Sequence, residues 1–358
     1  MLPRGAPLLL LAALVLPAIA VAQESAGFRL VSEREPERLE RRLRQAGNDG
    51  YRVLGTARGI DVDGNMRISV LLQRDATGLG PFDYRVLATS GNLDDETEYH
   101  KVNDLGADGF RLKVGGVLVR AVSDVWLPAD EYEDQMILIF ERGAVAVGVR
   151  YESERFGNPE EFERALKQRR VDGFEILGLW VTQRRLQAIL EAPLDSLASN
   201  STFKGEDYRM VILPTRKYLR DKLNRMAGQG YRVLTTEDPP TTGPPLMLLE
   251  RSASGPGKIE YRFFDDVPKK LHRDKLQAKL NGKAARGWFV AHGGVTDNVI
   301  TMERTSGDKP GVTYLAVSSS QKPGLSTVLE EAIAAGYDYV AMFVKPAETM
   351  VLLEKAVD

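Results

Sequence analysis

The sequence contains no cysteine. Disulfide bonds, thiolate metal sites and cysteine nucleophiles are therefore excluded, and so is a lipid anchor that needs a cysteine after a signal segment. Histidine is scarce, and none of the three (His100, His272 and His292) has a second histidine or a carboxylate at ligand spacing on the same predicted element. No hydrolase elbow, His-Glu-x-x-His motif, phosphate loop or dinucleotide fingerprint occurs. The sequence therefore predicts no metal, no cofactor and no catalytic residue within a single motif.

The chain also lacks an excess of charge of either sign. Its 48 basic and 50 acidic residues give a formal net charge of −2, which becomes −3 without the first 22 residues, because these carry Arg4 and no acid. This balance offers no electrostatic case for binding nucleic acid or an anionic membrane surface. Hydrophobic residues make up 43% of the chain, which is ordinary for a protein that buries a sizeable core.

Long hydrophobic runs are absent except at the N-terminus. Residues 1–22 have the pattern of a signal peptide, with the positive Arg4, the apolar run Leu8 to Ile19, and the small-x-small site Ala20-Val21-Ala22. The alternative is an uncleaved membrane anchor, but the run is short for a span and ends in the cleavage pattern. We therefore expect an exported protein, periplasmic or secreted, with no transmembrane segment in the mature chain.

A short pattern repeats along the rest of the chain. Each copy has a helix-like stretch, a glycine followed by an aromatic residue, and two strand-like stretches. An aliphatic residue lies seven places before each glycine, and in five copies an apolar residue lies four places earlier still, which marks one face of a helix. The glycine suits the left-handed residue after a helix. The six pairs are Gly50-Tyr51, Gly109-Phe110, Gly173-Phe174, Gly230-Tyr231, Gly287-Trp288 and Gly336-Tyr337.

Each copy also begins and ends with a strand pattern. The opening strands read aromatic-basic in four copies, as in Tyr84-Arg85, and we expect the tyrosine in the core and the arginine on the other face. Four closing strands end in Glu-Arg or Glu-Lys, as in Glu141-Arg142, which we interpret as solvated strand ends of little energetic weight. The order strand, helix, strand, strand predicts an α+β fold of six tandem βαββ units.

At this level the chain resembles a bacterial family known as domain-of-unknown-function family 4177. Leu223-Asn224 with Gly230-Tyr231 and Leu280-Asn281 with Gly287-Trp288 carry the resemblance best, and Val102-Asn103 follows. Units one, three and six lack the asparagine and have Arg44, Lys167 and Glu330 there. The resemblance covers nearly the whole mature chain and implies a small βαββ domain. It implies no catalytic residues.

Turn-rich stretches set the expected boundaries. The units are 23–75, 82–143 with an insertion at 115–134, 147–193, 206–252, 258–305 and 311–358. A unit of this size is too small to be secure alone, so we expect a helix on each three-strand sheet and neighbouring units packed together. Two arrangements stay open. The stretch Leu194 to Gly205 favours two halves of three units, and pairs of units could instead share a six-strand sheet.

The irregular second unit is the place where we expect function. Its insertion contains Trp126 and Tyr132, and Tyr99 and His100 depart from the helix pattern of the other units. These four residues are candidate contacts for a ligand, and the alternative is that the insertion packs over its own or the next unit.

Three functions are weighed. The leading hypothesis is a non-catalytic binding or scaffold protein whose partner is a protein or an envelope component. The second is an extracytoplasmic hydrolase with a site between units, and the third is a structural protein that assembles through exposed sheet edges. Oligomeric state and ligand do not follow from the sequence.

Overall fold

The computed structural model describes residues 27–60, 66–89, 96–120, 134–156, 158–181, 186–194, 208–212, 216–237, 246–251, 259–264, 270–296, 299–305, 311–345 and 347–357. The expected signal peptide, the hairpin turn at 61–65, Trp126, Tyr132 and most of the stretch from Leu194 to Gly205 lie outside these residues.

The described residues form an α+β protein with six helices and six three-stranded antiparallel sheets. Along the chain the elements follow the order strand, helix, strand, strand, which is consistent with repeated units. The first strands are β1 (Phe28–Glu33), β4 (Asp83–Thr89), β7 (Val149–Phe156), β10 (Tyr208–Ile212), β13 (Ile259–Phe263) and β16 (Val312–Ser318). The helices are α1 (Pro36–Asn48), α2 (Glu96–Ala107), α3 (Pro159–Val171), α4 (Arg216–Ala227), α5 (Arg273–Ala284) and α6 (Leu325–Ala334).

The remaining two strands of each unit follow its helix. The second strands are β2 (Tyr51–Ile60), β5 (Arg111–Arg120), β8 (Glu175–Val181), β11 (Tyr231–Glu237), β14 (Phe289–Val295) and β17 (Asp338–Val344). The last strands are β3 (Met66–Arg74), β6 (Asp134–Arg142), β9 (Leu186–Pro193), β12 (Leu246–Arg251), β15 (Ile300–Thr305) and β18 (Thr349–Ala356). In every sheet the last strand lies in the centre and pairs antiparallel with the other two, as in the order β1-β3-β2. Units therefore do not share six-strand sheets.

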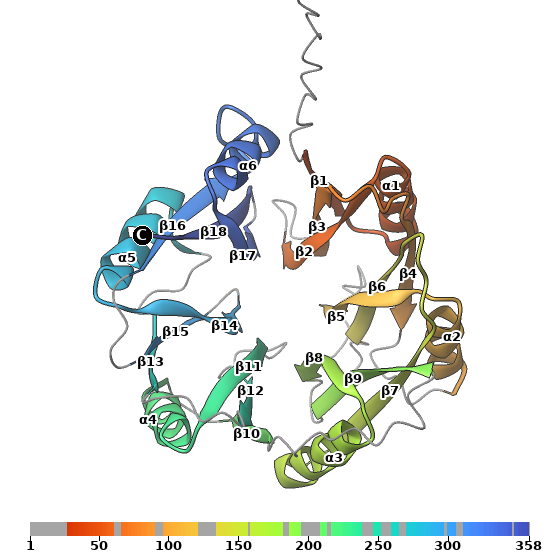
Figure 1. The fold of residues 1–358 in the computed structure, drawn as a ribbon, viewed down its shortest axis with the longest axis horizontal. Helices are drawn as coiled ribbons and strands as arrows, with labels where there is room; N and C mark the ends of the chain where they lie inside the picture. Colours follow the sequence, from red (N-terminus) through yellow and green to blue (C-terminus); the bar gives the residue numbers. More distant parts are fainter. Residues whose placement is uncertain are drawn as a thin grey trace, which may run out of the picture.

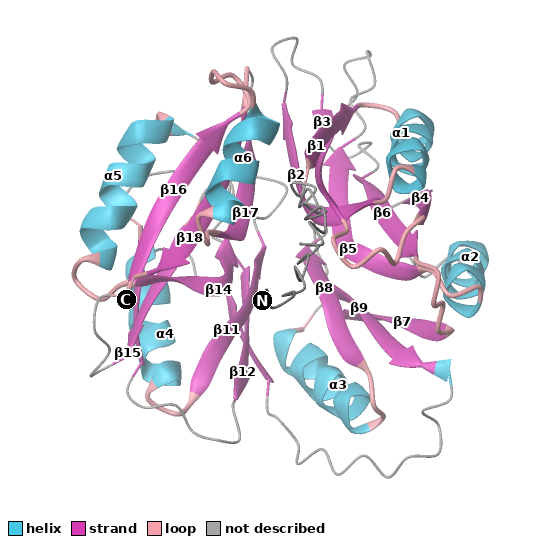
Figure 2. Cartoon of the chain, turned by 45° about the horizontal axis from the view of Figure 1, so that its top comes forward, coloured by secondary structure: helices cyan, strands magenta, loops and turns pink. Residues whose placement is uncertain are grey.

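The units are arranged in a closed ring (Figure 1). The helices form the outer rim, and the second strands face the centre (Figures 1 and 2). Each helix packs against the first strand of the following unit, as α1 does with β4 and α5 with β16. The same contact joins α6 to β1, and β17 packs against β2, so the last unit closes the ring onto the first. We call this sixth junction the seam.

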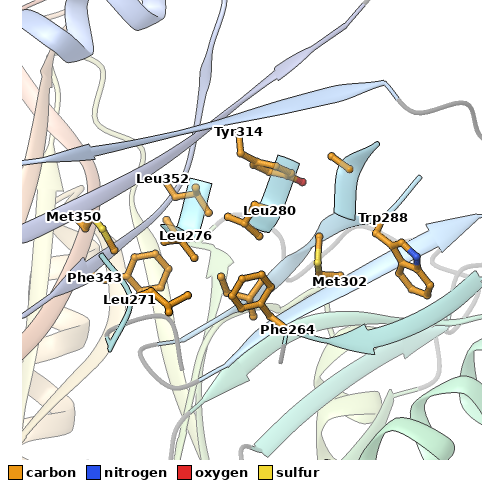
Figure 3. Packing of buried hydrophobic residues seen from close by; sticks show 13 residues of the cluster. Phe264, Leu271, Leu276, Leu280, Trp288, Met302, Tyr314, Phe343, Met350 and Leu352 are labelled. Atoms are coloured by element: carbon orange, nitrogen blue, oxygen red, sulfur yellow. The ribbon is translucent and has the colours of Figure 1, made fainter. Parts of the chain in front are cut away.

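The hydrophobic core lies between units rather than within them. Each of the six clusters of buried residues combines the helix and sheet of one unit with strands of the next. In β18, for example, Met350 and Leu352 face the cluster of α5, whereas Val351 and Leu353 face that of α6. Figure 3 shows Leu276 and Leu280 of α5 beside Tyr314 and Phe343 of the following unit. Both faces of each sheet are buried, which explains the continuous apolar runs of the last strands.

The turn after each helix has the conformation that the sequence predicts. All six turn glycines have positive φ, between 77° at Gly287 and 91° at Gly230, a region where a Cβ is costly. The aromatic residue that follows is buried in four units, as at Phe174 and Trp288. Tyr51 and Tyr337, on the two sides of the seam, are only partly buried.

The insertion expected in the second unit is partly strand. β5 continues through Gly115 to Arg120 and β6 begins at Asp134, so the two strands extend into the range 115–134 from both ends. Residues 121–133 lie outside the described part of the chain.

Replacing Trp288 by alanine tests the assignment of the turn aromatics to the core. Trp288 is 3% exposed and packs in the cluster between α5 and β16, so Trp288→Ala should cost about 3–5 kcal/mol. Chemical denaturation measures this loss, with Tyr337→Ala as a control that should cost less because Tyr337 is half-buried. A loss below about 1 kcal/mol for Trp288→Ala would contradict the core position.

Candidate functional site

A tyrosine and a glutamate form a hydrogen-bonded contact at each junction between successive units. Tyr84, at the start of β4, donates from its hydroxyl to Glu141 Oε2 at 2.8 Å. The backbone N–H of Val53 in the preceding unit donates to the same carboxylate at 3.0 Å. Tyr84 is fully buried and Glu141 is 4% exposed. We call this arrangement the junction latch, because it joins the last strand and first strand of one unit to the second strand of the unit before.

The latch recurs at the next four junctions. Its tyrosines are Tyr84, Tyr151, Tyr208, Tyr261 and Tyr314, and its glutamates are Glu141, Glu191, Glu250, Glu303 and Glu354. In three junctions the hydroxyl also accepts a backbone N–H three residues after the turn glycine, from Leu112 at 2.7 Å, Val233 at 3.2 Å and Val290 at 2.7 Å. In the second strand of all six units, a β-bulge or register shift begins at this position. The shift places the backbone amide toward the following unit.

The environment of the latch keeps its phenols protonated. Burial raises the pKa of Tyr84, Tyr151, Tyr261 and Tyr314 far above the usual value, and the neighbouring glutamate raises it further. These tyrosines are thus hydrogen-bond donors to carboxylates at any physiological pH. They have the chemistry of structural links and not of general bases.

At two junctions, an arginine of the preceding unit forms an ion pair with the latch glutamate. Arg52 lies 3.5 Å from Glu141, and Lys113 of the glutamate's own unit lies 3.1 Å away. Arg111 pairs in the same way with Glu191. The residue in this position is two places after the turn glycine, and in the other units it is Glu175, Arg232, Phe289 and Asp338.

Side chains of the helix hold the free edge of the following first strand. Asn103 accepts from the N–H of Tyr151 at 2.8 Å and donates to its carbonyl at 3.1 Å. Asn224 and Asn281 make the same pair of bonds to Tyr261 and Tyr314. The three asparagines are those of the expected Leu-Asn or Val-Asn motif. They satisfy the backbone groups of an edge strand that would otherwise be open to another chain.

Arginines also stack on the turn aromatics. Arg262 and Arg304 lie over the ring of Trp288, with their guanidinium carbons 4.9 and 4.7 Å from its centroid. In the third unit, where the closing strand lacks a basic end, Arg169 of α3 lies 5.8 Å from the ring of Phe174. The aromatic-basic pairs of the sequence thus serve contacts within the protein.

Among the described residues, no basic side chain pairs with the latch glutamate at the junction between the fifth and sixth units. Phe289 occupies the position of the arginine, and Asp338 lies directly opposite Glu354 in the β17–β18 ladder. Burial raises the pKa of Glu354 above its usual 4.5, Asp338 raises it too, and Tyr314 and His292 act in the opposite direction. Here the fold holds a carboxyl group that favours its protonated form.

A second polar cluster lies at the opposite end of the sixth unit. Glu348 accepts hydrogen bonds from Ser318 and Ser320, and Lys345 Nζ lies 2.9 Å from Glu348 Oε1 and donates to the carbonyl of Leu271 at 2.5 Å. Burial alone would raise the pKa of Glu348, but the bonds from Ser318 and Lys345 lower it overall. Ser318 is 3% exposed and donates to a carboxylate that is itself paired, so this serine is poorly placed to attack a substrate.

The predicted contact residues are only partly placed by the structure. Tyr99 and His100 are neighbours on α2 with ring centroids 6.2 Å apart, and His100 is exposed. His100 Nε2 lies 3.6 Å from Glu96 Oε1, one helical turn earlier, so the expectation that no histidine has a carboxylate on its own element was wrong. Trp126 and Tyr132 lie outside the described residues.

The closing Glu-Arg pairs were misjudged at the sequence level. Glu141 is 4% exposed and accepts a tyrosine hydroxyl, so it is not a solvated strand end, and Glu191, which occupies the same position without a basic residue after it, is buried in the same way. A signal was present in the sequence: the glutamate recurs at the same point in every unit that opens with tyrosine. The first unit, which opens with Phe28, has Gln73 in its place.

The described residues contain no group of three or more histidine and carboxylate side chains that could hold a metal ion. Within that part of the chain, no helix is long and apolar enough to cross a membrane.

No protein-family model matches the chain, and no curated protein matches it at a significant level.

Removing one latch hydroxyl should weaken a junction. Tyr84→Phe leaves the buried Glu141 without one of its donors and should lower the free energy of unfolding by about 1–3 kcal/mol. Chemical denaturation measures the change, and Tyr218→Phe, on the exposed surface of α4, should leave stability unchanged. Equal stability of the two variants would show that the latch contributes nothing.

The pH dependence of stability should reveal the uncovered Glu354. The pKa of Glu354 is raised in the folded state. Its contribution to the free energy of unfolding is therefore most favourable at pH values below the pKa of the unfolded chain, and it is lost as the pH rises through the pKa of the folded protein. Glu354→Gln should therefore unfold at a higher temperature than the wild type near neutral pH, and the difference should vanish in acid.

Glu348→Gln is the matched contrast. The folded pKa of Glu348 is lowered, so its contribution is present above the unfolded pKa and is lost as pH falls. This variant should be less stable than the wild type near neutral pH. Thermal melts across the acid range that show the same sign for both variants would contradict the two opposite pKa shifts.

Proposed function

We propose that this protein is an exported, non-catalytic binding or scaffold protein made of six βαββ units that resemble domain-of-unknown-function family 4177. The observation that carries the proposal is how the buried polar groups are used. In the described residues the buried tyrosine hydroxyls and glutamates bond one another across junctions, as Tyr84 does with Glu141 and Tyr151 with Glu191. Groups with perturbed pKa values usually point to an active site, but here a structural role accounts for them.

The arrangement of the histidines supports a non-catalytic role. His100, His272 and His292 are all exposed, and they come from α2, the residue before α5, and β14. A Ser-His-Asp hydrolase site would need one of them between an acid and an accessible serine. The most triad-like cluster, Ser318 with Glu348 and Lys345, has a buried serine.

The ring offers two kinds of surface to a partner. The inner wall consists of the six second strands, and the outer rim consists of the helices (Figure 1). The inner strands come from every unit, so a ligand at the centre would be contacted by all of them, as in other repeat proteins with a shared surface. We propose a protein or another envelope component as the partner, with the ring as a rigid platform.

Site-specific photo-crosslinking in intact cells tests the proposal. A crosslinking residue is placed on the inner wall at His292, on the outer rim at Tyr218, or on the linker between β6 and β7 at Val145, each of which is exposed. We expect one surface to capture the same component repeatedly while the other two do not. Charge reversal beside the capturing position should abolish capture without lowering the melting temperature. Absence of capture at all three positions, together with turnover of a hydrolase substrate by the purified protein, would reject the binding role.

A further inference from the structure

The seam differs from the other junctions in its covalent connection. Five junctions join units that are consecutive in the chain, whereas the seam joins the last unit to the first. The first strand at the seam, β1, is also the first element of the described chain. Of the six first strands, it is the only one with no described helix or strand before it in the chain.

The seam also lacks the junction latch. Phe28 stands where the other units have the latch tyrosine, and Gln73 stands opposite it in the place of the glutamate. Both polar partners are thus replaced together by uncharged groups that cannot form the tyrosine-carboxylate bond. The carboxylate of Asp338, two places after the turn glycine of the sixth unit, would face an acid at position 73 if the glutamate were kept.

In place of the latch, β1 is held by its ladder with β3, by Ser326 of α6, and by contacts with α1, where Val31 enters the core and Glu33 pairs with Arg42. β1 pairs along its whole length with β3, from Phe28 opposite Gln73 to Glu33 opposite Ile68. Ser326 of α6 accepts from the N–H of Phe28 at 3.3 Å and donates to its carbonyl at 2.8 Å. Among the described residues, the core at the seam has eight partly buried hydrophobic residues, and no other core has more than four. More of the hydrophobic side chains at this junction are therefore partly exposed than at the other five.

The connection between β1 and α1 is short and contains a proline. Only Arg34 and Glu35 separate the strand from Pro36 at the helix start. Glu35 has an extended backbone, with φ −101° and ψ 127°, as expected for a residue before proline. Short hinges favour the exchange of a terminal element between two copies.

We propose that two copies of this chain exchange β1, so that the strand of each copy occupies the seat formed by β3 and α6 of the other. The occupant follows from the seat itself, because β1 already fits its register, the apolar contacts of Phe28 with the core of α6, and the Ser326 bonds. The exchanged pair keeps the remaining contacts of both rings. This inference goes beyond the proposed function, since a pair of rings does not depend on what the ring binds.

The closed monomer and the exchanged pair contain the same strand contacts, so concentration and the hinge decide between them. At a low fraction of pairs, tenfold more protein should raise the ratio of paired to single chains about tenfold. Linkage within one chain favours the closed form in dilute solution.

A disulfide trap tests the proposal directly. Ser32 on β1 and Ser69 on β3 lie opposite each other with their Oγ atoms 2.7 Å apart, and the chain has no cysteine of its own. In the full chain carrying Ser32→Cys and Ser69→Cys, oxidation should give a link within one chain when the ring is closed. It should give a covalent dimer when β1 is exchanged.

The control places the same pair in the second unit. Ala88 on β4 and Ile137 on β6 also lie opposite each other, but β4 is held by the chain at both of its ends. Ala88→Cys with Ile137→Cys should give links within one chain only. Pro36→Ala in the first pair should lower the dimer fraction, because it relaxes the hinge.

Mass spectrometry of a mixture of isotopically labelled and unlabelled chains identifies the link. The expected result is a peptide pair joining positions 32 and 69 with one labelled and one unlabelled partner, in a dimer whose fraction rises with concentration. Links within one chain at every concentration, or no link at all, would overturn the proposal. A dimer that forms equally with the control pair would overturn it too.

Discussion

Each sheet of this protein is buried on both faces, and the rest of the structure follows from that constraint. A three-stranded sheet with a single helix covers only one of its faces, so the other face must find a cover in the neighbouring unit. The helix of each unit lies against the first strand of the next, and the resulting core belongs to both. A linear row would leave an uncovered sheet at one end and an unoccupied helix at the other. The ring removes both ends, as α6 covers β1.

Much of the local structure could be predicted from the sequence. The turn glycines and the aliphatic residues of the helices indicate the helix faces and their ends, because helix periodicity and left-handed turns are local properties. Leu39 and Leu43, for example, are both fully buried. The asparagine motif served only to mark the family resemblance, and the contact that Asn103, Asn224 and Asn281 make with the following unit appears in the structure alone.

The closed ring and the latch could not be predicted in the same way. Closure of the ring depends on the angle by which each unit is rotated relative to the next. The spacing of hydrophobic residues along the chain does not indicate this angle. The latch joins residues from two units, so Glu141 alone looks like an ordinary charged strand end, and only the partner Tyr84 and the bulge at Val53 explain it. Comparing the first unit with the others shows the coupling: tyrosine and glutamate are kept together in five units and replaced together in the first.

The linkers add a further consequence. Each linker joins the last strand of one unit to the first strand of the next unit. Around the ring, the unit that follows β18 is the first one, so β18 and β1 are placed like any other such pair of strands. A peptide as short as the existing linkers would therefore join the two ends of the folded chain. The chain could then be opened at any other linker, and a protein with a different first residue would have the same set of cores. The order of the units around the ring, and not the position of the termini, defines this fold.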